Sequence, residues 1–368
     1  MIRIIPIQEA YKRKIERQER LKGLKFKCQG NCAYVGEDIS PGCYGCFYSD
    51  ASIIGVSLGR SIGLPDVCNR DCVYCFLPHQ IQQNYSVPDG WRLTEEWKDA
   101  VRKYFMTEKQ RIITDCKMQY YNFTGNSEPL LYIPVLEEMI KFLRNVIDPF
   151  MGTKGWAKVY TNGTLLNMDN ILKLKDLEFD EVRIHPGATN FSKKVYDNMR
   201  LAVKHIPTVT IETPSWPPHR EKLFEMLPII EDIGIKHLDI CQIEIWSKEQ
   251  MEKIESTLGE IELYQVFYAM MDDGGLVEDI MKEVLEKDYS YSVIDCNCFR
   301  ALRTASLTNI YNNYWSLLNQ KYPPEWEKHR YGRKLSPRHR SGIWEKIIDV
   351  MGRRRAASRA GESAPRLG

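Results

Sequence analysis

The sequence predicts an α/β protein in which six parallel strands alternate with helices. One observation and one general rule of topology support this fold class. From about residue 52, short runs of β-branched or aromatic residues alternate with longer amphipathic segments, which is the pattern of repeated βα units. Successive parallel strands are joined by right-handed crossovers, so a sheet of this kind curls towards a barrel.

The expected elements follow one another in regular order along the chain. We expect strands at residues 61–64, 118–124, 157–161, 181–185, 208–213 and 237–243. Apolar residues recur at three and four positions in the segments between them, which predicts helices at 95–109, 133–146, 168–174, 192–205, 220–233 and 248–258.

Composition divides the chain into four expected regions. Residues 1–51 combine a charged helix at 8–24 with a cysteine-rich stretch at 28–46, whose Pro41, Gly42 and Gly45 suit loops that wrap a metal. Residues 52–260 carry the barrel. Residues 261–352 form a C-terminal extension or cap, with a helix near 277–287, a strand near 290–294 and an aromatic, basic helical stretch. Residues 353–368 lack apolar periodicity and are expected to be a disordered tail.

The overall composition fits a cytoplasmic protein that keeps its thiols reduced. No apolar run approaches the roughly 20 residues that a membrane span requires, so no membrane association is expected. A net charge of +2 gives the whole molecule no strong preference for nucleic acid. Eleven cysteines cannot all pair with one another, and thiolates are good ligands for zinc and iron–sulfur clusters. Metal binding is therefore expected rather than a disulfide framework.

Cys68, Cys72 and Cys75 form a C-x3-C-x2-C run with the aromatic Tyr74 before its last cysteine. Three thiolates at this spacing can hold three irons of a cubane cluster, and no fourth cysteine follows at a spacing that would complete the site. One iron would remain open. The structural alternatives for the same residues are a zinc loop or three buried thiols.

The run resembles the cluster motif of the radical S-adenosylmethionine (SAM) superfamily. This resemblance implies a partial (β/α)6 TIM-like barrel and a [4Fe-4S] cluster whose open iron is chelated by SAM. It also implies that a one-electron reductant such as flavodoxin or ferredoxin drives cleavage of SAM to methionine and a 5'-deoxyadenosyl radical, which abstracts a substrate hydrogen.

Two further segments resemble SAM-binding stretches of the superfamily. Residues 124–131 are similar to a Gly-Gly-Glu-Pro stretch whose carbonyl groups and carboxylate bind the SAM ammonium, although Asn126 and Ser127 replace the paired glycines. Residues 160–166 are similar to a turn near the methionine or ribose part of SAM. The resulting candidates for cofactor binding are Tyr74, Gly125, Asn126, Ser127, Glu128, Thr161, Asn162, Arg183 and Glu212.

Polar residues also lie where later strands are expected to end, which is where barrel enzymes build their active sites. His185, Cys241 and Glu244 are the catalytic candidates chosen on this ground, and Gln242 lies beside them. The structural alternative for each is an ordinary polar group that is satisfied within the fold or at its rim.

A second metal site is expected in the N-terminal region. Cys28, Cys32, Cys43 and Cys46 supply four thiolates within nineteen positions, enough for zinc, iron or an auxiliary iron–sulfur cluster. Three other cysteines have less certain roles. Cys296 and Cys298 could add ligands or be buried thiols, and Cys116 is expected to be a packed thiol.

The sequence indicates how the reaction begins and says little about its substrate. The favoured interpretation is an enzyme that modifies a ribosomally made peptide or protein, as peptide-maturing radical SAM enzymes do, with a separate partner binding the leader segment. An RNA-modifying enzyme is the alternative, because the barrel with residues 125–131 and the basic C-terminal extension also resemble radical SAM proteins that modify tRNA bases. A non-catalytic binding protein stapled by metal is the third interpretation.

Overall fold

The computed structural model describes most of the first 296 residues: 2–5, 7–27, 32–47, 52–58, 62–76, 79–115, 119–125, 127–245, 247–265 and 269–296. The expected segments at 261–352 and 353–368 therefore lie largely or wholly outside the described residues. No helix within the described residues is both long enough and apolar enough to cross a membrane.

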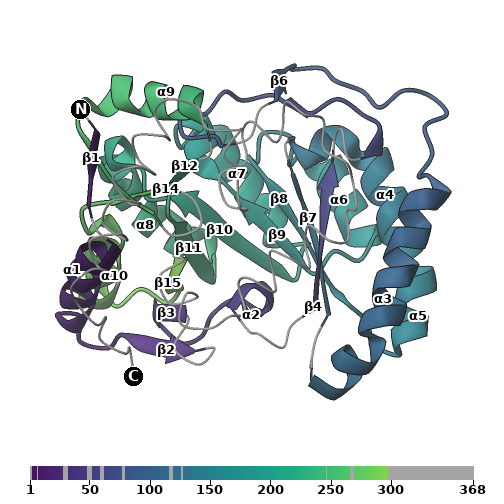
Figure 1. The fold of residues 1–368 in the computed structure, drawn as a ribbon, viewed down its shortest axis with the longest axis horizontal. Coiled ribbons are helices and arrows are strands. Elements are labelled where there is room, and N and C mark those ends of the chain that lie inside the picture. The colour runs from purple at the N-terminus through teal and green to yellow at the C-terminus, as the bar shows by residue number, and fades with distance from the viewer. Residues whose placement is uncertain are drawn as a thin grey trace, which may run out of the picture.

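A curved sheet of nine strands forms the centre of the molecule (Figure 1). Its seven neighbouring parallel strands are β4 (Ser52–Leu58), β7 (Gln119–Gly125), β8 (Trp156–Thr161), β9 (Glu181–Ile184), β10 (Thr208–Pro214), β11 (His237–Cys241) and β15 (Ser292–Cys296). Two antiparallel strands, β3 (Cys32–Val35) and β2 (Lys25–Lys27), continue the sheet beyond β15. Strands β2 and β4 are the two edges, so the barrel is partial and open.

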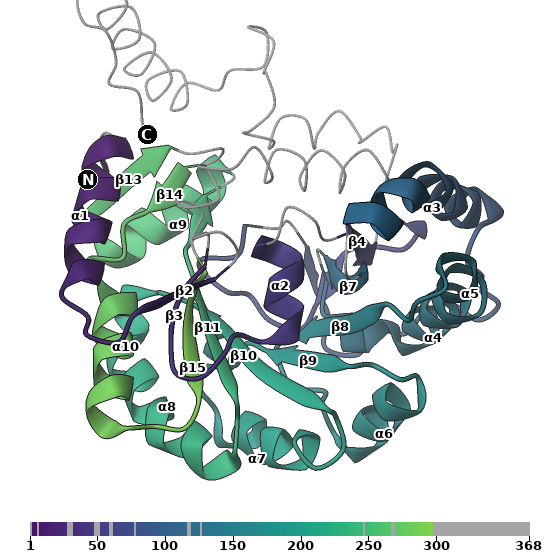
Figure 2. The same ribbon diagram turned by 90° about the horizontal axis from the view of Figure 1, so that it is seen from below.

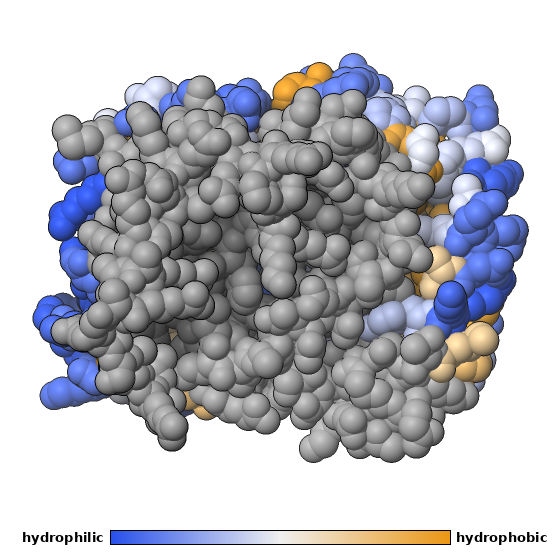
Figure 3. All heavy atoms as spheres, viewed as in Figure 1, coloured by the Kyte–Doolittle hydropathy of each residue, from blue (hydrophilic) through white to orange (hydrophobic). Residues whose placement is uncertain are grey.

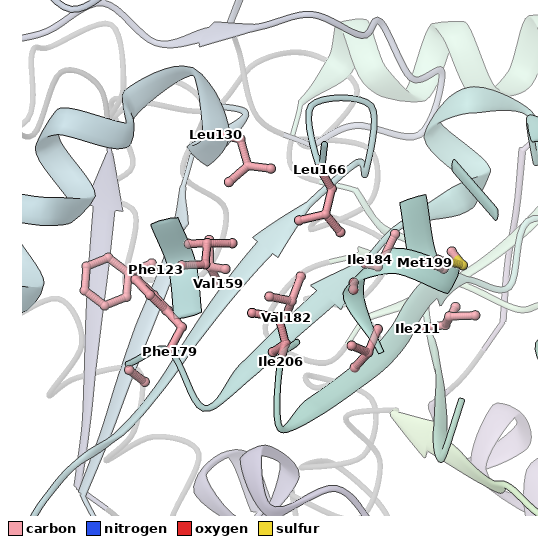
Figure 4. Close-up of a cluster of buried hydrophobic side chains, with 14 of the residues drawn as sticks. Phe123, Leu130, Val159, Leu166, Phe179, Val182, Ile184, Met199, Ile206 and Ile211 are labelled. Atoms are coloured by element: carbon pink, nitrogen blue, oxygen red, sulfur yellow. The ribbon is translucent and has the colours of Figure 1, made fainter. Parts of the chain in front are cut away.

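Helices cover the outer, convex face of this sheet (Figure 2). They are α3 (Glu95–Asp115), α4 (Ile133–Phe142), α5 (Asp148–Met151), α6 (Met168–Asp176), α7 (Lys193–Ala202), α8 (Arg220–Ile233) and α10 (Leu276–Lys287), with a π-helical turn at Leu143–Ile147. Apolar side chains of the strands form one cluster with those of the helices and loops, in which Phe123 lies beside Phe179 and Ile184 lies beside Met199 of α7 (Figure 4). The flank near α3 is mainly hydrophilic (Figure 3).

The concave face differs from the outer face because it carries charged and polar side chains. Alternation along the strands places Lys158 and Tyr160 on β8, and Glu181 and Arg183 on β9, towards the inside. A short helix, α2 (Pro41–Phe47), lies within the curve of the sheet (Figure 2). The N-terminal region therefore fills part of the barrel lumen.

A smaller sheet packs beside one end of the barrel. Its order is β1 (Ile2–Ile4), β13 (Ile261–Gln265), β14 (Ala269–Met271) and β12 (Glu244–Ile245), with α9 (Lys248–Leu258) close by. Helix α1 (Ile7–Glu19) is fixed to the barrel by the buried Lys14, whose Nζ lies 2.7 Å from Glu278 and 2.9 Å from Asp295. These two carboxylates raise the pKa of Lys14 despite its burial.

The structure confirms the α/β class and corrects the expected secondary structure or extent of three segments. Residues 62–64 form a turn in which Gly63 has a φ of +76°, so the first strand is not at 61–64 but is the β-branched run of β4. Strand β15 joins β11, so the sheet extends past residue 260. The stretch at 28–46 was expected to be loops, yet it contains β3 and α2, because β3 pairs with β15.

Candidate active site and metal centres

The three motif cysteines lie on one short, half-buried loop. Cys68 ends β5 (Val67–Cys68), which pairs with β6 (Gln80–Ile81), and the backbone N–H of Cys75 donates to the carbonyl of Cys72 at 3.0 Å. Burial, with smaller contributions from neighbouring motif thiols, raises the pKa of Cys68 to about 11 and that of Cys72 to about 12. The motif thiols are thus close enough to repel one another when they are deprotonated. The thiolate ligands of one shared cluster lie equally close together.

The loop is attached to the carboxyl ends of β7 and β8. The Val67 N–H donates to the Tyr132 hydroxyl at 3.0 Å, and the Glu128 N–H donates to the Val67 carbonyl at 3.0 Å. Asn69 joins the loop to the next strand end, since its side-chain carbonyl accepts from Asn162 Nδ2 at 2.7 Å and its Nδ2 donates to Thr164 Oγ1 at 2.9 Å. The loop is held at the strand ends where barrel enzymes bind their substrates.

Glu128 fastens the ends of β7 and β8 together. Its two carboxylate oxygens accept from the Thr161 hydroxyl at 2.5 Å, the Asn162 N–H at 2.8 Å and the Leu130 N–H at 3.2 Å. Burial raises its pKa to about 7, and these donors partly oppose that rise. The polar atoms expected to bind SAM are thus bonded to one another in this structure, and their contact with SAM stays a prediction.

Tyr74 forms one wall beside the cysteine loop. Its hydroxyl lies 3.0 Å from His185 Nε2, and its ring packs against Trp216 with centroids 5.5 Å apart. A Cβ on Gly187 would come within 3.0 Å of the Tyr74 hydroxyl, so the chain must pass close to Tyr74 here. Burial lowers the pKa of His185 to about 3, which keeps its imidazole neutral near pH 7.

Arg183 lies deeper in the lumen and bonds to acidic groups rather than to the strand-end surface. One guanidinium nitrogen lies 2.6 Å from both Glu212 Oε2 and Asp239 Oδ2, and Nε lies 2.9 Å from Glu181 Oε1. The second terminal nitrogen donates to the Cys43 sulfur at 3.0 Å. Although burial acts against the charge, these anionic neighbours raise the pKa of Arg183. Buried charges persist only when paired in this way.

Helix α2 fits closely onto this charged cluster. A Cβ on Gly42 would lie only 2.0 Å from Glu181 Oε2, so the position requires glycine. The Gly42 carbonyl accepts from the fully buried Lys158 at 2.8 Å, and the Ser40 hydroxyl donates to Glu181 at 2.7 Å. The Arg183 guanidinium lowers the pKa of Glu181 to about 2, overcoming the effect of burial. The cluster therefore holds the N-terminal region inside the barrel.

The structure brings together only part of the second metal set expected from the sequence. Cys32 and Cys43 are buried in one cluster, where Cys296 of β15 packs against them. Cys28 lies outside the described residues, as do Asn126, Cys116 and Cys298, and the side chain of Cys46 is not described. Across the parts that are described, no three His, Cys, Asp or Glu side chains are already arranged around a single-ion site.

The remaining candidates lie at the strand ends as expected. Gly125 ends β7, and the Ser127 hydroxyl accepts from the Val67 N–H at 3.2 Å. Cys241 ends β11. Burial raises the pKa of its thiol, and nearby acidic side chains raise it further. Glu244 begins β12, and its carbonyl accepts from Gln250 Nε2 at 2.7 Å.

Several site residues were missed by the sequence analysis. Asn69 stands inside the cluster motif, and His79 Nδ1 lies 3.8 Å from the Cys75 sulfur. Lys158, Glu181 and Asp239 belong to the lumen cluster. Charged residues at alternate positions of otherwise apolar strands were the signal that could have identified this last group.

Comparison with known proteins agrees with the resemblance read from the motif. No protein-family model matches the chain. A putative glycyl-radical enzyme activating enzyme of Methanocaldococcus jannaschii is 26% identical over 196 residues, which are 51% of this chain and 48% of that protein. The match thus spans about half of the curated relative. It confirms the resemblance to radical SAM enzymes.

Solved structures give weaker likenesses. Native anSMEcpe with bound AdoMet has a TM-score of 0.43 at 15% identity, with 66% of this chain and 64% of that chain covered. Streptococcus suis SuiB bound to S-adenosylmethionine has a TM-score of 0.44 at 12% identity, with 77% of this chain and 55% of that chain covered.

Proposed function

We propose that this chain, a radical SAM protein by its cysteine motif and its curated relative, cleaves SAM reductively and abstracts a hydrogen atom from a peptide or protein. The observation that carries the proposal is the attachment of the Cys68, Cys72 and Cys75 loop to the carboxyl ends of β7 and β8. An external one-electron donor such as flavodoxin or ferredoxin completes the system.

The motif residues fit an iron–sulfur cluster by their chemistry. Three thiols lie on one short loop. Besides burial, Cys75 raises the pKa of Cys68, and Cys75 and Cys68 raise the pKa of Cys72. When bound, a [4Fe-4S] cluster would supply the electron that cleaves SAM to methionine and a 5'-deoxyadenosyl radical. His79 lies beside Cys75, and its Nε2 is 3.0 Å from the Arg70 carbonyl oxygen. Because this second contact fixes the imidazole, His79 orients the last cysteine of the motif.

The surrounding residues position the loop and limit the access of water. Asn69, Asn162 and Thr164 fix the loop to the end of β8 through buried hydrogen bonds. Tyr74 and Trp216 provide an aromatic wall beside the loop. A reactive radical requires a site that excludes solvent and other hydrogen donors, and a neutral His185 bonded to Tyr74 suits such a wall.

A polypeptide substrate is the finer part of the proposal. Its support is the curated relative, which is named as an activating enzyme of a glycyl-radical enzyme. The expected target of that relative is therefore itself a protein. An RNA substrate remains the alternative outcome of the binding test, and there the affinity would fall steeply with salt because phosphate binding releases counterions.

The activity test is anaerobic reconstitution with iron and sulfide, followed by dithionite and SAM and by chromatography of 5'-deoxyadenosine. We expect the wild-type chain to form 5'-deoxyadenosine and the Cys68→Ala/Cys72→Ala/Cys75→Ala variant to form none, while its circular dichroism is unchanged. Cys116→Ala is the matched cysteine control and should keep activity. Equal 5'-deoxyadenosine from the triple variant would disprove the cluster assignment.

The substrate test uses peptides and proteins encoded beside the gene, prepared with deuterium at carbon-bound positions. Transfer of deuterium into 5'-deoxyadenosine would identify the hydrogen donor. If none of them transfers deuterium and a tRNA pool binds with strong salt dependence, the polypeptide proposal is wrong.

A further inference from the structure

A row of cysteines crosses three neighbouring strands on the concave face of the sheet. Cys241 of β11 pairs directly with Cys296 of β15 in the parallel register. On the other side of β15, Asp295 pairs with Ala33 in the antiparallel register, so the next step sets Cys296 opposite Cys32. Directly paired residues point to the same face of a sheet, so the three side chains share one face.

That face is the lumen. Asp239 lies two residues before Cys241, and its carboxylate bonds to the lumen residues Arg183 and Cys43 at 2.6 Å and 2.9 Å. Since side chains alternate along a strand, Cys241 faces the same way as Asp239. Cys32 and Cys296 lie in one packed cluster with Cys43 of α2. Cys32, Cys241 and Cys296 therefore face the lumen, as does Cys43 of α2.

From this juxtaposition we propose that Cys32, Cys43, Cys241 and Cys296 bind an auxiliary iron–sulfur cluster in the lumen. The sequence alone suggested Cys28 and Cys46 as partners of Cys32 and Cys43. The register instead sets Cys241 of β11 and Cys296 of β15 in one row with Cys32 of β3.

The spacing favours a cluster over a single ion. Neighbouring strands lie about 4.8 Å apart, so the two outer cysteines of the row are separated by about twice that distance. A tetrahedral zinc site draws all four sulfurs to about 2.3 Å from one ion. In a cluster each thiolate binds a different iron, so the ligands can stand farther apart.

The surroundings provide the outer contacts of such a site. Arg183 donates to the Cys43 sulfur at 3.0 Å, and hydrogen bonds of this kind orient thiolate ligands and tune a cluster. The site would also lie close to the motif loop, because the Cys241 carbonyl accepts from the Ser215 N–H at 2.8 Å and the neighbouring Trp216 packs against Tyr74 of that loop. An electron or a substrate radical could then pass between the two centres.

The test does not depend on the proposed SAM chemistry, because it starts from the full chain carrying Cys68→Ala, Cys72→Ala and Cys75→Ala. After anaerobic reconstitution we expect this variant to retain iron and acid-labile sulfide, with a Mössbauer spectrum of tetrahedral Fe–S sites. Adding Cys296→Ser or Cys241→Ser should lower the iron content at least about tenfold. The matched controls Cys28→Ser and Cys46→Ser in the same background should keep it.

Thermal unfolding of each apoprotein distinguishes the loss of a ligand from misfolding. If a variant without iron unfolds at the same temperature as its parent, its lower iron content results from the missing thiol and not from a damaged fold. The proposal is overturned if the parent variant binds only zinc, or if thiol titration shows a Cys32–Cys296 disulfide instead. It is equally overturned if Cys28→Ser and Cys46→Ser lose the iron while Cys241→Ser and Cys296→Ser retain it.

Discussion

The two groups of cysteines differ in how the fold brings them together. Cys68, Cys72 and Cys75 lie on one loop, so their spacing in the sequence already states that they are neighbours. The lumen group depends on the register of β3, β15 and β11, and its members come from distant parts of the chain. Local spacing thus reveals a site built by one loop, whereas a site built by strand pairing becomes visible only in the folded sheet.

The largest expected effect comes from breaking the charged cluster beside Cys43. Arg183→Met leaves Glu181, Asp239 and Glu212 without their shared guanidinium, and removing one partner of a buried charge network costs about 3–5 kcal/mol. Equilibrium urea unfolding measures this loss of free energy.

The matched control for that change is Arg102→Met on the exposed surface of α3. Its ion pairs with Glu95 and Asp99 are solvent-exposed, so a cost below about 0.5 kcal/mol is expected. Equal costs for the two variants would mean that the lumen cluster contributes no more to stability than surface charge does.

A smaller effect is expected from Gly42→Ala, which disturbs the fit of α2. Alanine is favoured over glycine in a helix by about 1 kcal/mol, yet its Cβ would collide with Glu181, and overpacking costs about 1–3 kcal/mol. The added Cβ would lie only 2.0 Å from Glu181, so we expect the upper end of the overpacking range, a net destabilisation of about 2 kcal/mol in urea unfolding, together with a loss of lumen iron.

Gly187→Ala provides the comparison on the loop side. Its Cβ would approach the Tyr74 hydroxyl, His185 and Thr213, all of which are side-chain atoms. This change should lower 5'-deoxyadenosine formation and leave the lumen iron in place. If both glycine variants lowered the same readout, the two centres could not be treated as separate sites.

The difference between the groups also explains what the sequence could predict. The βα alternation located β7 to β11 and the helices between them, because hydrophobic periodicity is a local property. The pairing of β3 with β15 could not be read in this way, since it joins the N-terminal region to the last described strand. The contact of Glu128 with SAM stays a prediction. The hydrogen bonds that its two oxygens accept from the end of β8 could not be predicted, because they depend on tertiary packing.

His185 gives the smallest effect, and it tests the wall of the loop site through pH. Its folded pKa of about 3 lies below the ordinary value of 6.5, so the unfolded chain takes up a proton first as the pH falls. Stability is therefore lost between pH 6.5 and pH 3. Since His185 is partly exposed, we expect about 1 kcal/mol of this loss between pH 7.5 and 5.5.

His185→Gln should remove that part of the pH dependence, because glutamine does not titrate and its amide can still bond to the Tyr74 hydroxyl. Urea unfolding at a series of pH values measures the difference between variant and wild type. Tyr74→Phe is the control: it deletes the hydroxyl but leaves the half-buried imidazole in place, so the pH dependence should persist. If His185→Gln followed the wild-type pH curve, the imidazole would have to be charged or solvated in the folded chain, and a dry aromatic wall beside the cysteine loop would be untenable.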